Sequence, residues 1–148
     1  GGGDENIKES KTEDDVTYIK THANLSKPVQ GIITSPYGPR TPTEIISANH
    51  AGVDIGVEEG TPIVSAMDGV VELVSSEGGY GNHVKITNGE ISTIYAHCSK
   101  ITVQQGGAVH KGDKIAEAGS TGNATGPHLH FEIRRNDVTV NPQEVMEL

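Results

Sequence analysis

Short runs rich in Val and Ile, separated by turns that contain glycine, dominate the chain from residue 28 onward. Apolar and polar residues alternate in several of them, as in Val53-Asp54-Ile55, which is the period of a β-strand with one buried face. The runs that predict strands are residues 31–34, 53–57, 62–66, 69–74, 83–87, 91–97, 114–118 and 129–134. Because turn signals separate these runs, we expect a mainly β fold built on an antiparallel β-sheet or sandwich.

The turns account for much of the glycine, which makes up 19 of the 148 residues. Asn88-Gly89, between two predicted strands, is the strongest hairpin signal because both residues tolerate the positive φ of a tight turn. The pattern predicts no long amphipathic helix. Asn141-Pro142 could begin a short helix near the C-terminus, since proline is favoured at the first helical position.

The first 27 residues differ in composition from the rest. Residues 1–15 contain six acidic residues, two lysines and one large apolar residue, Ile7. Such a segment buries too little apolar surface to offset the entropy lost on ordering. We therefore predict a mobile acidic leader over residues 1–27, suited to tethering the chain to an upstream element and carrying an exposed His22. A single domain is expected over residues 28–148.

Charge and residue types exclude several classes of function. The formal net charge of −9 disfavours a nucleic acid or an anionic membrane surface as the partner. No apolar run approaches the roughly 18–20 residues of a membrane-spanning helix. The lone cysteine, Cys98, excludes an internal disulfide and a thiolate zinc cluster, and we expect it to pack as a small hydrophobic residue. Residues 61–70 resemble a biotin or lipoyl carrier, but Met67-Asp68-Gly69 stands where a carrier needs an exposed lysine.

Histidine and aspartate side chains gather on one face of two predicted strands. Residues of equal parity share a face in an extended chain, so His50, Gly52 and Asp54 project together. Gly52 between the other two leaves room above the backbone for an ion. His128 and His130 project side by side in the same way. A solvated histidine pair on an outer face would give the same pattern, so the pair alone leaves both interpretations open.

Two imidazoles and one carboxylate match the three protein ligands of a catalytic Zn²⁺, which keeps a fourth position open for water. Zinc lowers the pKa of that water from near 16 to about 7 and polarises a carbonyl group. Peptide hydrolysis also needs a base and a donor for the oxyanion. The HExxH motif of thermolysin-like enzymes is absent from the sequence, so the remaining histidines, including His97, are the natural candidates.

A series of motifs follows in order between residues 35 and 142. They are Tyr37-Gly38-Pro39-Arg40, HAGVDIG (50–56), Gly60-Thr61-Pro62, Gly69-Val70-Val71, Gly79-Tyr80-Gly81-Asn82, Tyr95-Ala96-His97 and GSTGNATGPHLHF (119–131). Together they resemble the lysostaphin-type (LytM-like) zinc metallopeptidases, which cut peptide bonds in bacterial cell walls. The resemblance implies the fold of that family, a twisted antiparallel β-sheet of the duplicated hybrid motif type with the metal on the floor of a groove.

The resemblance also implies the site and the activity. One Zn²⁺ per chain would be bound by His50, Asp54 and His130, with His128 and His97 activating the water and stabilising the oxyanion. The expected function is a zinc metalloendopeptidase that hydrolyses peptide bonds in peptidoglycan cross-links or stem peptides. We expect it outside the cytoplasm, in the cell wall, secreted or anchored to the membrane through an N-terminal part, and as a monomer. Whether a glycine bridge or a stem cross-link is cut stays open.

The alternative function is a non-hydrolytic cell-envelope module that uses the same groove for binding or assembly. Members of that kind often lack ligands, and here none is missing.

Five residues within or near these motifs carry weaker expectations. Glu132 is expected to be exposed on its strand, with a supporting role behind the histidines as the alternative. His83 and His110 are expected at the surface. Arg40, like Tyr37, could belong to a groove wall or pack within a turn.

Overall fold

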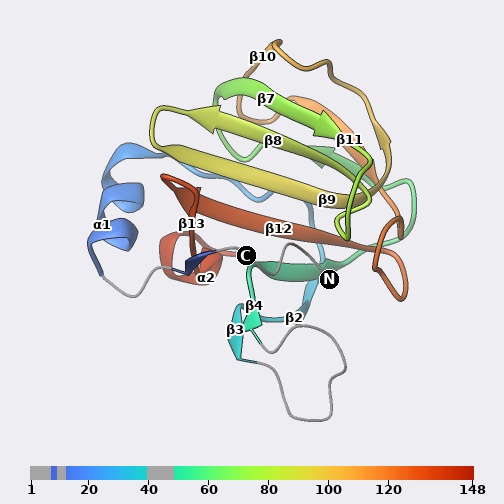
Figure 1. Cartoon of the computed structure of the whole chain (residues 1–148), viewed down its shortest axis with the longest axis horizontal. Coiled ribbons are helices and arrows are strands. Elements are labelled where there is room, and N and C mark those ends of the chain that lie inside the picture. Colours follow the sequence, from blue (N-terminus) through green and yellow to red (C-terminus); the bar gives the residue numbers. More distant parts are fainter. Residues whose placement is uncertain (1–7, 10–12, 40–48) are drawn as a thin grey trace.

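The computed structural model describes residues 8–9, 13–39 and 49–148, and its regular structure is mostly β-strand (Figure 1). The strands are β1 (Lys8–Glu9), β2 (Ile32–Ser35), β3 (Gly38–Pro39), β4 (Asn49–His50), β5 (Val53–Gly56), β6 (Pro62–Val64), β7 (Gly69–Ser75), β8 (Asn82–Asn88), β9 (Ile91–Ile101), β10 (Ala108–Val109), β11 (Lys114–Ala118), β12 (His128–Arg135) and β13 (Val138–Val140). The helices are α1 (Glu13–His22) and α2 (Pro142–Val145). Every predicted run overlaps a strand, so the mainly β prediction is confirmed.

Eleven of the strands form one sheet, whose main path runs β1-β13-β12-β9-β8-β7-β10, while β3 and β4 form a separate pair. The pairings within the large sheet are antiparallel, except that β1 runs parallel to β13. Strand β12 pairs with β9 along one edge and with β5 and then β13 along the other. The N-terminal half of β12 therefore lies between β5 and β9, and this is where the chemistry gathers.

The short strands β1, β3, β4, β10 and β13 were not predicted. Each is two or three residues long, which is too short for an alternating pattern to show. Of these, β1 and β10 pair with strands distant in sequence, whereas β13 forms a tight hairpin with β12.

The core confirms the alternation predicted for β12. Leu129, Phe131 and Ile133 are fully buried, and each such side chain contributes about 1.5–3 kcal/mol by leaving water. The ring centroid of Phe131 lies 5.4 Å from that of Tyr95 in β9. Cys98 is also fully buried, and this burial raises the pKa of its thiol to about 12. Its expected packing as a hydrophobic residue is confirmed.

Helix α1 is a feature that the hydrophobic pattern does not predict. It lies within the segment interpreted as a leader, yet Ile19 is fully buried and Arg135 of β12 contacts the helix from the sheet. The guanidinium lies 3.9 Å from the ring centroid of Tyr18 and donates to Asp15 Oδ1 at 3.1 Å. One buried residue is too sparse for a periodic signal. The division of the chain at residue 27 stays a prediction, and residues 1–7 and 10–12 lie outside the described residues.

Helix α2 begins as the sequence predicts. Asn141 caps it by accepting a hydrogen bond from the backbone N–H of Gln143 at 3.0 Å, and Pro142 follows the cap. Within the described ranges, neither helix is long and apolar enough to span a membrane.

Candidate metal centre

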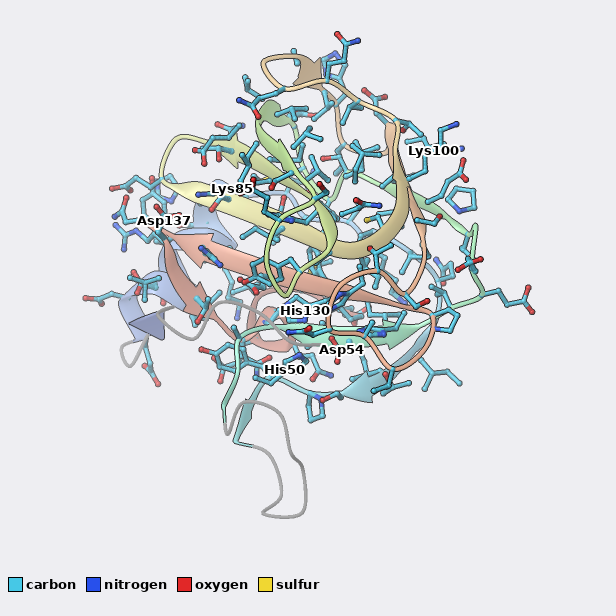
Figure 2. The ribbon with its side chains drawn as sticks, turned by 45° about the vertical axis from the view of Figure 1, so that its right-hand side comes forward. His50, Asp54, Lys85, Lys100, His130 and Asp137 are labelled. Atoms are coloured by element: carbon cyan, nitrogen blue, oxygen red, sulfur yellow. The ribbon has the colours of Figure 1, made fainter. Side chains whose placement is uncertain are left out.

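Three side chains converge where β4, β5 and β12 meet. His50 ends β4, Asp54 lies in β5, and His130 in β12 is the direct cross-strand partner of Asp54. Asp54 Oδ1 lies 2.9 Å from His130 Nδ1 and 3.2 Å from His50 Nε2, and the two nitrogens are 3.1 Å apart. All three residues are buried, and Figure 2 shows them close together beside β5 and β12.

The second nitrogen of each ring determines which atom faces the cluster. His50 Nδ1 donates to the carbonyl oxygen of Pro36 at 3.0 Å, and His130 Nε2 donates to Glu132 Oε2 at 2.7 Å. Since a carbonyl or carboxylate only accepts, these nitrogens hold the proton in the neutral rings. His50 Nε2 and His130 Nδ1 therefore direct lone pairs at each other and at Asp54.

This donor set fits a zinc ion. Three lone-pair-bearing atoms within 3.2 Å repel one another unless a cation or additional protons lie between them. Four donors in a tetrahedron around Zn²⁺, at about 2.0–2.1 Å from it, stand roughly 3.3 Å apart. Two imidazole nitrogens and one carboxylate oxygen also leave a fourth position for water or substrate.

His97 and His128 lie beside the three groups. Their ring centroids are 4.9 Å apart, and that of His97 is 5.9 Å from that of His130. His128 Nδ1 donates to the carbonyl oxygen of Gly126 at 2.8 Å, and its Nε2 lies 3.6 Å from Asp54 Oδ1. The structure thus brings together all five site residues predicted from the sequence.

His97 is held by the loop that contains residues 119–126. Its Nδ1 donates to the carbonyl oxygen of Thr121 at 2.7 Å, so Nε2 carries the lone pair of the neutral ring. This Nε2 is buried and has no hydrogen-bond partner among the described residues. Burial lowers the pKa of His97 to about 3, although the bond to Thr121 opposes that change. At neutral pH the ring is therefore an unprotonated base.

The backbone at His97 is strained. Its φ is 63°, in the left-handed region that non-glycine residues rarely occupy, and the register between β8 and β9 shifts close by. Such irregularities re-aim side chains and gather at functional sites. The supporting loop approaches the turn before β8 so closely that a Cβ on Gly122 would lie 2.4 Å from the Gly81 nitrogen.

The structure corrects the expectation for Glu132. This residue is fully buried rather than exposed, and its carboxylate accepts a hydrogen bond from the protonated Nε2 of His130. Its carboxylate also accepts hydrogen bonds from Arg134 Nε and from the Tyr80 hydroxyl. Burial alone would raise the pKa of Glu132, but the hydrogen bond to His130 and the positive charge of Arg134 lower it. The alternative role behind the histidines fits these contacts.

The structure also changes the interpretation of Gly52. A Cβ at this position would lie 2.3 Å from the Phe131 carbonyl oxygen and 2.8 Å from Glu132 Cγ. The space above Gly52 is therefore filled by β12 and the Glu132 side chain, not by an ion.

The expectations for the other histidines and for Tyr37 are confirmed only in part. His83 is buried, not at the surface, and its Nδ1 donates to the Gly81 carbonyl oxygen at 2.8 Å. His110 and His22 are exposed, as expected. The Tyr37 hydroxyl donates to the Thr139 carbonyl oxygen at 3.3 Å, which favours packing over a groove wall. Arg40 lies outside the described residues.

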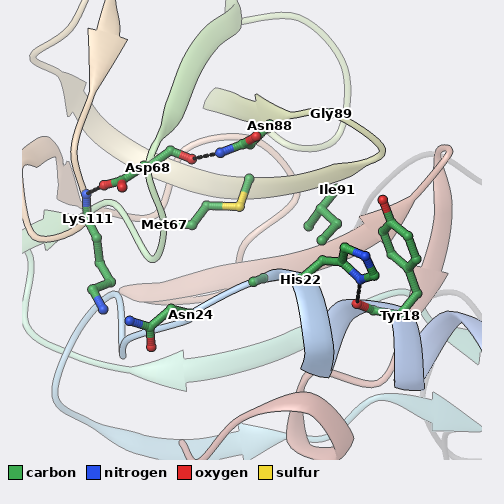
Figure 3. Close-up of a pocket in the computed structure, with 10 residues that line it drawn as sticks. Tyr18, His22, Asn24, Met67, Asp68, Asn88, Gly89, Ile91 and Lys111 are labelled. Atoms are coloured by element: carbon green, nitrogen blue, oxygen red, sulfur yellow. Dashed lines mark hydrogen bonds between the residues drawn. The ribbon is translucent and has the colours of Figure 1, made fainter.

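A cavity of about 370 Å³ lies elsewhere, between α1 and the β8–β9 turn (Figure 3). None of the five site residues lines it. Asp68, on its wall, already accepts from the backbone nitrogen of Lys111 and from the Asn88 side chain. These hydrogen bonds account for the position of Asp68 in the wall of the cavity.

Comparison with known proteins places the site in a family. Residues 48–142, which include all five site residues, match the model of Peptidase family M23. The chain belongs to this family. His50, Asp54 and His130 are the candidate metal-binding group of this M23 domain.

Two curated relatives illustrate the similarity of this M23 domain. The chain is 41% identical over 124 residues to the DD-carboxypeptidase/endopeptidase Mpg of Neisseria meningitidis, covering 82% of this chain and 29% of that protein. It is 40% identical over 104 residues to the peptidoglycan DD-endopeptidase ShyA of Vibrio cholerae, covering 68% of this chain and 24% of that protein. The chain thus spans less than a third of the length of either relative.

Solved structures agree with the fold of the M23 domain. A zinc-containing peptidase from Vibrio cholerae matches with a TM-score of 0.75 and 35% identity, over 86% of this chain and 40% of that one. The catalytic domain of the antimicrobial peptidase lysostaphin from Staphylococcus simulans matches with a TM-score of 0.67 and 26% identity, over 88% and 96%. The lysostaphin-like fold predicted from the motifs is confirmed.

Proposed function

We propose that this chain is a zinc metalloendopeptidase that hydrolyses peptide cross-links of peptidoglycan. The observation that carries the proposal is the buried convergence of His50 Nε2, Asp54 Oδ1 and His130 Nδ1 within 3.2 Å. Zinc bound by these atoms would lower the pKa of a water molecule to about 7 and polarise the scissile carbonyl group. The complete set of site residues favours catalysis over a non-hydrolytic binding module.

His97 and His128 would carry the proton and stabilise the developing charge. The neutral His97 ring presents an unprotonated Nε2, which can take a proton from the attacking water and later give it to the leaving amine. The proton on His97 Nδ1 stays on that nitrogen throughout, hydrogen-bonded to the Thr121 carbonyl oxygen. His128, whose Nδ1 is held by Gly126, places Nε2 beside Asp54 and would donate to the oxyanion once protonated.

The names of two relatives favour one class of substrate. Two relatives, 41% and 40% identical to this chain over the matched residues, are named as a DD-carboxypeptidase/endopeptidase and as a peptidoglycan DD-endopeptidase, so we favour a DD-type cross-link over a glycine bridge. Such a substrate places the working enzyme in the cell envelope, outside the cytoplasm. Secretion or anchoring, and a monomeric state, remain part of the proposal.

The test is the variant His128→Ala, with His110→Ala as the control because His110 is exposed and remote from the cluster. We expect about one zinc per chain in both variants. Release of muropeptides from purified walls, measured by mass spectrometry, should fall by about 10²–10⁴-fold only in His128→Ala, the usual contribution of an acid–base group. Undiminished cleavage in His128→Ala would refute its role, and zinc binding without any cleavage by the unmodified chain would favour a binding module.

A further inference from the structure

A row of polar side chains continues from the candidate metal centre along one face of β12. His130, Glu132 and Arg134 alternate with the core residues of the strand and therefore share a face. Glu132 is fully buried, and the side chain of Arg134 is 12% exposed. A carboxylate in this position needs strong partners to remain charged.

Both oxygens of Glu132 have such partners. Oε1 accepts hydrogen bonds from Arg134 Nε at 2.9 Å and Nη2 at 2.7 Å, and Oε2 accepts from His130 Nε2 and the Tyr80 hydroxyl. Arg134 Nη2 also donates to the Tyr80 oxygen at 3.0 Å. The carboxylate is therefore fixed on three sides by groups that can only donate to it.

Steric contacts hold the same arrangement. The Tyr80 ring centroid lies 5.6 Å from that of His130 and 5.1 Å from that of the buried His83. The absent side chain of Gly52 lets Glu132 lie beneath the turn that joins His50 to Asp54. Glu132 is thus in contact with both the ligand histidine and the turn that carries the other two candidate ligands.

We propose that Glu132, fixed by Tyr80 and Arg134, is a positioning residue for His130 that sets its tautomer and ring orientation so that Nδ1 faces the metal. With one proton held on Nε2 by Glu132, Nδ1 already faces Asp54 and His50 before any ion binds. A carboxylate behind a histidine also makes its other nitrogen a stronger metal ligand. The inference extends the proposed function, because it assumes that the cluster binds zinc.

The first test needs no metal. In the metal-free protein, nitrogen–proton NMR correlations of the histidine rings should show His130 protonated at Nε2. Glu132→Gln should produce a mixture of tautomers, because the amide cannot accept from both His130 and Arg134 as the carboxylate does. An unmodified protein in which His130 Nε2 lacks its proton in half or more of the molecules would overturn the proposal whether or not zinc binds.

The second test measures zinc affinity by competition with a chromophoric chelator. Glu132→Gln should weaken binding by about 10–100-fold, the usual effect of losing such a partner, and alter the visible spectrum of the cobalt-substituted protein. Asp137→Asn is the matched control, since this exposed carboxylate lies 3.9 Å from Arg134 and, among the described residues, does not contact His130. An equal loss of zinc affinity in both variants would show that the effect comes only from the change in net charge, and it would overturn the proposal.

A gentler variant keeps the test decisive if Glu132→Gln does not fold. Tyr80→Phe retains the ring and removes one hydrogen bond to Glu132, so we expect a several-fold loss of zinc affinity with an unchanged circular dichroism spectrum. An unchanged affinity in Tyr80→Phe would exclude Tyr80 from the arrangement. An unmodified chain that shows the expected tautomer but binds no zinc would refute the proposed function and leave the positioning of His130 standing.

Discussion

Two histidines at the centre of this molecule, His130 and His97, are buried alike but held differently. His130 lies within β12, paired on both edges, and its Nε2 donates to the carboxylate of Glu132. His97 lies where the β8–β9 register shifts, at a positive φ, and its Nδ1 donates to a loop carbonyl. One ring is fixed by strand pairing and a charge, the other by a local distortion and a neutral group.

In the proposed mechanism, this difference separates the ligand side of the site from the proton-handling side. A negative charge behind His130 strengthens the lone pair of its other nitrogen, which suits a permanent ligand. A neutral carbonyl behind His97 fixes the tautomer without holding a second proton strongly. Burial lowers the pKa of His97 to about 3, so the ring is unprotonated at neutral pH and would hold an accepted proton only transiently.

Removing each ring in turn breaks the comparison most sharply. His130→Ala should lose zinc and cleavage together, because two remaining ligands cannot retain the ion. His97→Ala should keep about one zinc per chain while cleavage falls by about 10²–10⁴-fold. Metal analysis and muropeptide release on the same preparations provide both measurements. Loss of zinc in His97→Ala would show that the two sides are not separate.

The ligand side was predictable because it follows from strand parity. Alternation alone places His128 and His130 on one face of their strand, and the structure pairs His130 directly with Asp54. The motif resemblance then predicts that His130 is the ligand and His128 the catalytic histidine. Neither step needs knowledge of distant contacts beyond the pairing of two strands.

The support behind these histidines was not predictable from local pattern. Glu132 follows two histidines on a polar strand face, which indicates exposure, yet the turn at Gly52 and the Tyr80 ring cover it. The positive φ of His97 likewise depends on Thr121, whose hydroxyl donates to the Cys98 carbonyl oxygen at 2.7 Å. Helix α1 was missed because only Ile19 signals its buried side.

The pH dependence of stability sharpens the comparison in the metal-free protein. His97 has a folded pKa of about 3 against its usual value of 6.5, so between these values the unfolded chain binds more protons than the folded one. The free energy of unfolding should therefore rise with pH across that window, by up to about 1.4 kcal/mol per pH unit for this one group.

His97→Asn isolates the contribution, because asparagine does not titrate and tolerates a positive φ. The slope of unfolding free energy against pH, from urea titrations between pH 3.5 and 6, should be smaller in this variant than in the unmodified chain. Equal slopes would show that His97 titrates normally in the folded protein.

The smallest effect concerns the backbone distortion that distinguishes His97 from His130. At a φ of 63°, glycine avoids the clash between Cβ and the following carbonyl oxygen that any other residue retains. His97→Gly should therefore be more stable than His97→Ala by about 1 kcal/mol, measured by urea unfolding of the metal-free variants, although both lack the catalytic ring. The same pair at His130, which shows no positive φ, should have the opposite order, because glycine in a strand interior is destabilising by roughly 0.5–1 kcal/mol. If alanine is the more stable residue at both positions, the distortion at His97 stores no strain, and only the hydrogen-bond partners distinguish the two histidines.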